Sequence, residues 1–213
     1  MGQTAEATDR DILDLILGPA TSSQTYLNLL YLLLAFPLGI IYFIFLITAL
    51  SLGAGLIVIY IGIPILFAVL VACWGLGAFE RQMAQSMLHL KIPGAPLPPG
   101  PGFWRKLRAV FTDTMTWKSL TYLLLKFPFG VTVFVVLVTA FSISISLILA
   151  PLLYRTVPID FYFWQVDTRD EATIWCLVGV VLLIVSMHLV NGLAMVWGRF
   201  ARIMLAPDPP VGR

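Results

Sequence analysis

Four long apolar stretches divide this chain, and the segments between them hold most of its charged residues. The stretches run over residues 26–50, 56–79, 117–149 and 172–197. About 20 apolar residues in a helix cross the hydrocarbon core of a membrane, because a helix rises about 1.5 Å per residue. The pattern therefore predicts four transmembrane helices. A short uncharged turn at 51–55 joins the first two, and Gly62 and Pro64 predict a break near the start of the second.

Two segments beside the apolar stretches have the period of an amphipathic helix. Residues 80–92 place methionines and a leucine on one face, and residues 103–115 place aromatic and aliphatic side chains opposite a basic cluster. A basic amphipathic helix is typical of an anionic membrane surface, although a contact with another protein would produce the same pattern. The candidate lipid contacts are Trp104, Arg105, Lys106 and Arg108.

An internal repeat organises the chain. Residues 31–51 read YLLLAFPLGIIYFIFLITALS and residues 122–142 read YLLLKFPFGVTVFVVLVTAFS, with 12 of 21 positions identical at a constant offset of 91. Apolar composition would align leucines by chance, but not Tyr, Phe-Pro-x-Gly and Thr-Ala-x-Ser in one register. We interpret the repeat as a duplication, so two related halves are expected.

The repeat resumes near the end of each half and defines the organisation of the chain. Phe79-x-Arg81-x-Met83 matches Phe200-x-Arg202-x-Met204 at an offset of 121, so the second half contains extra residues, which form an outer loop at 150–171. The predicted parts are an N-terminal segment (1–25), a first repeat (26–92), a Pro/Gly linker (93–102), a second repeat (103–205) and a tail (206–213).

Composition agrees with a membrane location. The chain is 60% hydrophobic and 11% charged, with a mean hydropathy of +0.95, whereas a soluble domain carries about 25% charged residues. The predicted fold is an all-α integral membrane protein, with four transmembrane helices as two duplicated hairpins plus interfacial amphipathic helices. No basic stripe of the kind that binds nucleic acid is present, so membrane lipids, another membrane protein or a second copy of the chain are the expected partners.

The positions of the charges predict the topology. Residues 80–118 hold six Lys or Arg residues and residues 198–213 hold three, whereas the 150–171 loop holds two against four acids. The positive-inside rule then places both termini and the central linker in the cytoplasm of a multi-pass protein of the cell membrane. Each half is an in-out-in hairpin, so both halves are expected to have the same orientation.

Three of the polar residues inside the predicted spans are candidate sites. Lys126 is charged, and an intramembrane charge is a functional candidate, but its long side chain is expected to extend to the inner headgroups because helical side chains point towards the N-terminus. His188 and Asn191 lie one turn apart, and hydrogen bonds to a neighbouring helix are the expected role. A haem ligand or proton relay is the alternative for His188. Glu80 and Arg81 are expected at the inner boundary, against headgroups or a partner.

The outer loop is the other candidate site, because it is the feature that makes the halves different. It combines an aromatic run with acidic residues, which suits either recognition of a partner or anchoring at the outer headgroups. The candidate recognition residues are Phe161, Tyr162, Phe163, Trp164 and Asp167. No spacing typical of a catalytic, cofactor or metal site is present. Cys73 and Cys176 are expected on opposite sides of the membrane and therefore unpaired.

Several motifs in a fixed order resemble one family. They are Tyr-Leu-Leu-Leu-x-Phe-Pro-x-Gly at 31–39, Ser-Leu-Gly-Ala-Gly-Leu at 51–56, Gly-x-Pro at 62–64, Phe-Glu-Arg at 79–81, and Thr-Trp-Lys at 116–118 leading into Tyr-Leu-Leu-Leu-Lys-Phe-Pro at 122–128. The chain resembles the bacterial and archaeal putative sensor domain, a four-span module often found ahead of a histidine kinase. The resemblance covers residues 25–205.

The resemblance implies a membrane sensing module without catalysis of its own. A histidine kinase needs a phosphoacceptor helix and an ATP-binding domain, and neither follows residue 213, so we expect this chain to act through a partner protein. A structural or accessory subunit of a larger membrane complex is the alternative. A small transporter component is a third hypothesis, which the scarcity of charge in the spans disfavours. No cofactor is expected.

Overall fold

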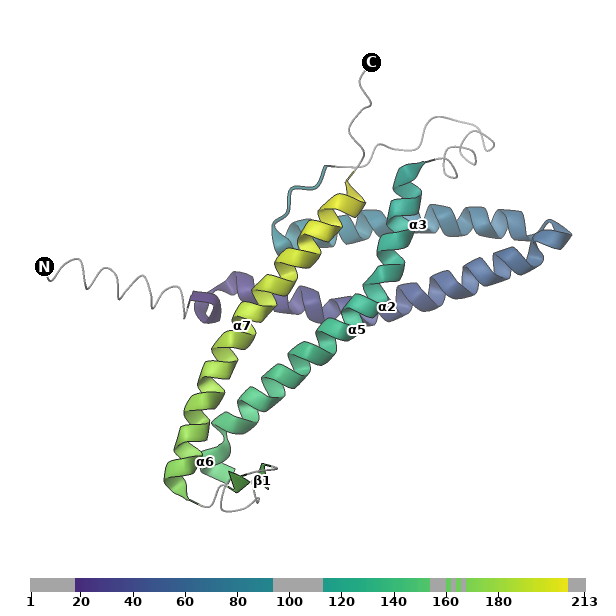
Figure 1. Cartoon of the computed structure of the whole chain (residues 1–213). Coiled ribbons are helices and arrows are strands. Elements are labelled where there is room, and N and C mark those ends of the chain that lie inside the picture. The colour runs from purple at the N-terminus through teal and green to yellow at the C-terminus, as the bar shows by residue number, and fades with distance from the viewer. Residues whose placement is uncertain (1–17, 94–112, 154–159, 162–163, 166–167, 207–213) are drawn as a thin grey trace, which may run out of the picture. The chain divides into compact units, whose positions relative to one another are not determined.

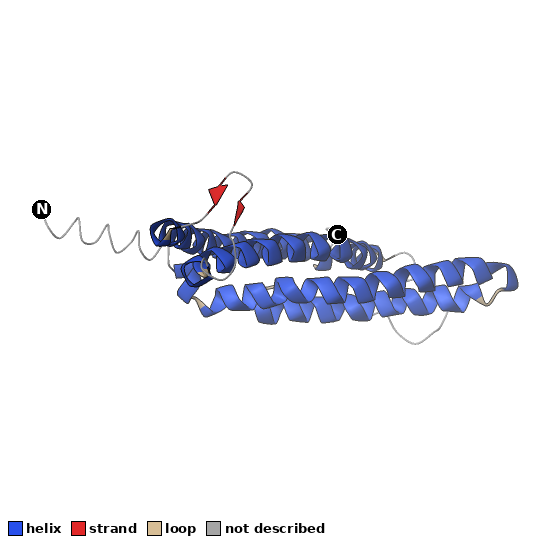
Figure 2. Cartoon of the chain, turned by 90° about the horizontal axis from the view of Figure 1, so that it is seen from below, coloured by secondary structure: helices blue, strands red, loops and turns tan. Residues whose placement is uncertain are grey.

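The computed structural model describes residues 18–93, 113–153, 160–161, 164–165 and 168–206. Helices make up nearly all of these residues, and the only strands among them, β1 (Asp160–Phe161) and β2 (Trp164–Gln165), form one small antiparallel pair (Figure 2). Four helices in the described residues are long and apolar enough to cross a membrane, with hydropathies of 2.1 to 2.6. The predicted all-α membrane fold with four spans is confirmed.

The first helical hairpin consists of α2 (Ser23–Gly55), the short 3-10 helix η1 (Leu56–Ile59) and α3 (Gly62–Leu88). Figure 1 shows α3 returning alongside α2. The predicted turn at 51–55 is wrong, because α2 continues to Gly55 and the chain reverses through η1 and Tyr60, whose φ is 62°. A Cβ at Gly62 would lie 2.1 Å from the carbonyl oxygen of Gly53, so the tight reversal requires glycine there.

The expected break at Gly62 and Pro64 is the beginning of α3, where proline in the first turn is tolerated because that turn's N–H groups have no intrahelical partners. The second span and the predicted amphipathic helix at 80–92 are one continuous helix that ends at Leu88. His89, with φ 51°, terminates it in the left-handed conformation. The separate interfacial helix predicted at 80–92 is therefore wrong.

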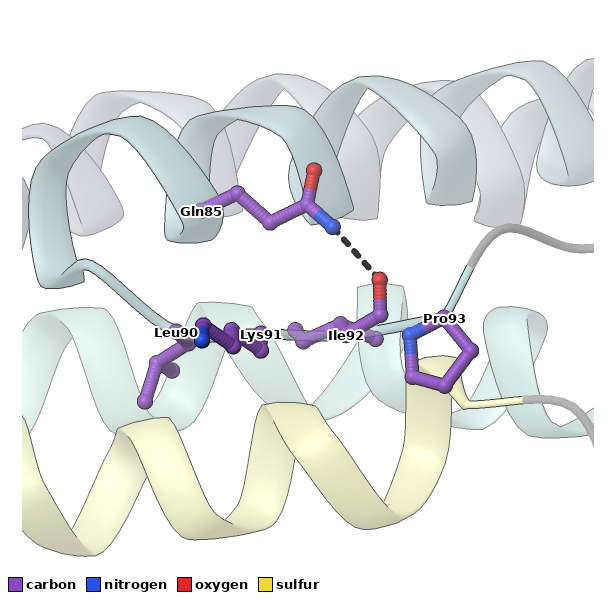
Figure 3. A pocket seen from close by; sticks show the side chains of 5 residues that line it. All are labelled: Gln85, Leu90, Lys91, Ile92 and Pro93. Atoms are coloured by element: carbon purple, nitrogen blue, oxygen red, sulfur yellow. Dashed lines mark hydrogen bonds between the residues drawn. The ribbon is translucent and has the colours of Figure 1, made fainter.

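The chain after α3 is held against that helix. Gln85 Nε2 donates a hydrogen bond of 2.5 Å to the carbonyl oxygen of Ile92 (Figure 3). Ile92 is buried, and Gln85 and residues 90–93 line a pocket of about 440 Å³. A Cβ added to Gly198 of α7 (Arg169–Leu205) would lie 3.1 Å from Leu90 Cδ1, so this short segment also contacts the last helix.

The second hairpin consists of α5 (Thr114–Ile148), α6 (Ala150–Leu153), the β1–β2 pair and α7. Thr168 and Glu171 form a reciprocal cap at the start of α7: Glu171 N donates to Thr168 Oγ1 and Thr168 N donates to Glu171 Oε2, both at 3.3 Å. This capping box satisfies two backbone groups at the start of the helix. α7 extends beyond the predicted span of 172–197 at both ends, whereas α5 begins before the predicted span of 117–149 and ends at Ile148.

The helices form two compact units. One comprises the described parts of Met1–Tyr26 and Phe134–Gly192, and the other comprises Leu27–Val133 and Leu193–Arg213, again where described. In the first unit, Gly179 of α7 allows close approach to α5, since an added Cβ would lie 2.8 Å from Leu147 Cβ. In the same unit Asn191 Nδ2 donates to Thr25 Oγ1 of α2 at 3.0 Å, which confirms the predicted interhelical hydrogen bond of Asn191.

The second unit is built on a crossing of α2 and α5 at the repeat. A Cβ on Gly39 would lie 2.9 Å from the Lys126 carbonyl oxygen, and a Cβ on Gly130 would lie 2.6 Å from the Ala35 carbonyl oxygen. These contacts are reciprocal, because Gly39 and Gly130, like Ala35 and Lys126, are equivalent at the offset of 91. Glycine at these two equivalent positions lets the backbones of the two helices meet at the crossing.

Candidate functional site

A buried ion pair lies in the second unit, beside the crossing of α2 and α5. Lys126 of α5 donates through Nζ to Glu80 Oε2 of α3, and both side chains are fully buried. Removing two charges from water costs several kcal/mol for each ion, so a buried pair persists only where further hydrogen bonds satisfy its atoms. The surroundings of Glu80 therefore decide whether this pair is stable.

Three hydroxyl groups and an indole extend the pair into a network. Tyr42 OH donates to Glu80 Oε1 at 2.8 Å, and Tyr122 OH lies 3.4 Å from Glu80 Oε2 as a second donor to the carboxylate. The hydroxyl oxygens of Tyr31 and Tyr122 lie 3.3 Å apart, and Trp197 Nε1 donates to Tyr122 OH at 3.2 Å. In the described residues no buried side-chain N or O atom is without a hydrogen-bond partner. We call these six residues the charge cluster: Tyr31, Tyr42, Glu80, Tyr122, Lys126 and Trp197.

Aromatic rings enclose the cluster. Lys126 Nζ lies 5.5 Å from the centre of the Tyr31 ring and 5.8 Å from that of Tyr42, within the range of a cation–π interaction. Trp197 stacks on Phe129 with ring centres 3.8 Å apart. The rings exclude water, which strengthens the electrostatic attraction between the two charges. Residues of α2, α3, α5 and α7 all belong to the cluster, so it links every long helix of the second unit.

The part of the chain that holds the charge cluster also matches a known protein family. A family model described as "Putative sensor" matches residues 31–205, which include both copies of the repeat and every residue of the charge cluster. The chain belongs to this sensor family. Comparison with curated proteins and with solved structures gave no match. The resemblance inferred from the ordered motifs is confirmed, and with it the assignment of a membrane sensor domain.

The structure corrects the expected position of Lys126 in this sensor domain. Its side chain does not extend to headgroups, because Glu80 supplies a counter-ion within the protein. Glu80 is likewise fully buried inside the protein, so its side chain does not contact headgroups. Arg81 beside it is also buried and donates through Nε to the Leu205 carbonyl oxygen at 3.1 Å. One signal in the sequence was available: Glu80 and Lys126 both stand where the other repeat has alanine, Ala201 and Ala35.

The remaining candidate residues of the sensor domain lie elsewhere. His188 is exposed and its Nδ1 lies 3.0 Å from the Ile184 carbonyl oxygen of the same helix. His188 and Asn191 belong to the first unit, so neither is part of the charge cluster. No group of three His, Cys, Asp or Glu side chains able to hold a metal occurs among the described residues.

The outer loop contains the β1–β2 pair. Phe161 and Trp164 are partners across the two strands, as are Asp160 and Gln165. The other candidate recognition residues, Tyr162, Phe163 and Asp167, lie outside the described residues, as do the candidate lipid contacts Trp104, Arg105, Lys106 and Arg108. A recognition role for the loop and a lipid contact for the basic segment stay predictions.

Proposed function

We propose that this sensor domain acts on a partner protein, without catalysis of its own, and that the charge cluster carries the signal. The observation that supports this proposal is the buried pair of Glu80 and Lys126, which joins α3 to α5. An ion pair in an apolar frame is either made or broken, because a partly separated pair leaves each buried charge without its counter-ion. Such a contact suits an element with two states, which a sensor requires.

The connection from the cluster to the rest of the chain supports a route for the signal. Glu80 lies in the same helix as Gln85, whose side chain holds the segment 90–93 through the carbonyl oxygen of Ile92. A movement of α3 relative to α5 would therefore change how the chain leaves α3. We expect the partner to read that change at the membrane surface, where the following linker was predicted.

The outer loop is the proposed input. The β1–β2 pair lies in this loop, and loops on a helical frame commonly carry recognition. The aromatic and acidic residues at 160–171 would suit a cationic group or a basic partner segment. In this proposal the loop binds, the cluster changes, and the partner responds.

The test is recovery of the partner from native membranes, with a matched variant. The double variant Glu80→Gln and Lys126→Met removes both charges while keeping the side-chain sizes close. We expect the partner to be recovered with the native chain and with the double variant, and we expect only the native chain to change the cells' gene-expression profile when it is produced.

Two outcomes would overturn the proposal. A native chain that is recovered without any partner and that leaves the expression profile unchanged does not signal. A partner complex that falls apart when the chain is deleted, with no effect of the double variant, would instead identify a structural subunit.

A further inference from the structure

The short segment that follows α3 forms a pocket at the end of that helix. The pocket is lined by Gln85, Leu90, Lys91, Ile92 and Pro93 (Figure 3). Its volume of about 440 Å³ lies within the range of roughly 300–1,000 Å³ that small-molecule sites occupy. Three of the lining residues are apolar, one is an amide and one is a cation. None belongs to the charge cluster, so the pocket is a separate feature of the second unit.

Lys91 stands between two anchored neighbours. The carbonyl oxygen of Ile92 accepts the hydrogen bond from Gln85 Nε2, and the Ile92 side chain is buried. On the other side, a Cβ added to Gly198 of α7 would lie 3.1 Å from Leu90 Cδ1, so Leu90 packs against α7. Lys91 itself is exposed, and its side chain makes no hydrogen bond or ion pair in the part of the chain that the structure describes. Its ammonium is therefore held at the pocket without a partner.

The parts of the chain that meet at this pocket are basic and contain no acidic residue. Residues 81–93 and 193–206 hold Arg81, Lys91, Arg199 and Arg202, and neither Asp nor Glu. Arg81 is already matched by the Leu205 carbonyl oxygen at the C-terminal end of α7, where a cation is favourable. The other three cations are exposed. An anion at the pocket would therefore be attracted by these residues and repelled by none of them.

The pocket lies where the exposed side chains of α3 change in character. Val71 and Phe79 are exposed apolar residues of this helix, whereas Gln82, Gln85 and His89 are exposed polar residues. Apolar side chains suit the hydrocarbon of a membrane, and polar side chains are unfavourable there. Gln85 lies six residues after Phe79, which is about 9 Å along a helix. This places the pocket at the depth of the lipid headgroups.

We propose that this pocket binds the headgroup of an anionic phospholipid, with the Lys91 ammonium on the phosphate. Lysine binds phosphate as a point charge, and basic pockets between membrane helices bind anionic headgroups. The apolar walls suit the glycerol and first methylene groups of the same lipid, which a free phosphate ion lacks. The inference concerns the lipid alone and needs no partner or stimulus, so it can fail while the proposed function stands.

Native mass spectrometry of the purified chain in detergent tests the proposal. It resolves single bound lipids, so the dissociation constant of the first lipid is compared between phosphatidylglycerol, which is anionic, and phosphatidylcholine, which is zwitterionic. Lys91→Gln removes the charge at the pocket, and Lys91→Arg keeps it. Arg169→Gln is the matched control, because Arg169 is an exposed cation at the start of α7 that does not line the pocket.

We expect the native chain, Lys91→Arg and Arg169→Gln to prefer phosphatidylglycerol by the same factor. Lys91→Gln should reduce this preference about fivefold, the contribution of one basic residue near an anionic surface. Gln85→Leu releases Ile92 while keeping every charge, so it should reduce the preference as well. Thermal unfolding is measured in parallel, and the variants at the exposed Lys91 decide the outcome if Gln85→Leu does not fold.

Three results would overturn the proposal. An equal loss in Lys91→Gln and Arg169→Gln would reduce the effect to net charge. An undiminished preference in a folded Gln85→Leu variant would show that Lys91 attracts lipid without the pocket. Displacement of the bound lipid by soluble glycerol phosphate in large excess would identify a site for free phosphate instead of a lipid.

Discussion

The crossing of α2 and α5 and the charge cluster beside it use the internal repeat in opposite ways. At the crossing both copies supply the same residues, and Gly39 and Gly130 bring the two backbones together in reciprocal contacts. In the cluster the copies differ, since Glu80 and Lys126 stand where the other half has buried Ala201 and Ala35. Identical residues build the frame, and the residues that differ make one side of the frame polar.

This difference between the crossing and the charge cluster indicates where a specific function can arise in a duplicated membrane protein. A symmetric frame of helices depends only on the shapes of the side chains that pack in it, because small and apolar residues pack equally well in both halves. A charge inside that frame is tolerated only with a partner, so its position is specified by residues from more than one helix. Substitutions in the two regions should therefore differ in how much they change stability and for what physical reason.

The largest effect is expected from removing one charge of the cluster. Lys126→Met leaves the Glu80 carboxylate buried without its counter-ion, which should lower the free energy of unfolding by roughly 3–5 kcal/mol. The measurement is unfolding of the purified protein in detergent. The double variant Lys126→Met with Glu80→Gln should recover most of that loss. If the single and double variants are equally unstable, the pair does not act as a unit.

A smaller effect is expected from the tyrosine that holds the carboxylate. Tyr42→Phe keeps the ring but removes the 2.8 Å hydrogen bond to Glu80 Oε1. A hydrogen bond to a charged group contributes about 1.5–3 kcal/mol, so stability should fall by that amount. Tyr60→Phe is the matched control, because Tyr60 is 79% exposed and its substitution should have little effect. Equal stability of the two variants would contradict the role of Tyr42.

The crossing should respond to added volume rather than to lost charge. Gly130→Ala places a Cβ 2.6 Å from the Ala35 carbonyl oxygen and must push α2 and α5 apart, at a cost of about 1–3 kcal/mol. Gly75→Ala is the control, because nothing lies within 4 Å of a Cβ there and alanine favours a helix. A Gly130→Ala variant as stable as Gly75→Ala would show that the crossing is looser than these distances require.

The smallest effect on stability is expected in the outer loop. Phe161→Ala with Trp164→Ala should leave the unfolding transition unchanged, because the first half builds its hairpin without such a loop. Recovery of the partner should nevertheless be lost if the loop binds it. Leu152→Ala, at a residue 75% exposed in the adjacent α6, serves as the control for a general loss of apolar surface. Retained partner recovery, or unfolding of the double variant, would contradict a recognition role.

Several features of this protein follow from its sequence alone. The length and apolarity of each stretch determine four membrane-spanning helices, because crossing a bilayer depends on composition counted along the chain. The duplication identifies Gly39 and Gly130 as equivalent positions before any contact is known. The order of the motifs also identified the sensor family. Each of these properties is local or periodic, so no knowledge of distant neighbours is needed.

Local reasoning was less successful at the ends of the helices. The small residues at 51–55 predicted a turn, but α2 continues through them and the chain reverses where Gly62 can approach the backbone of Gly53. The polar residues after Phe79 predicted a new helix at the membrane surface, although α3 runs on to Leu88. A glycine or a charge marks a helix end only when the surrounding structure leaves that backbone or side chain in water.

Only the tertiary structure decided the charge cluster. Glu80 and Lys126 are 46 positions apart, and each alone predicts a side chain that reaches towards headgroups, because an isolated charge is unfavourable in an apolar interior. The packing of α3 against α5 gives each charge its counter-ion, and Tyr42 and Tyr122 supply the remaining donors. Burial of a charge depends on what other helices bring to it, and that information is not present in any single stretch of the chain.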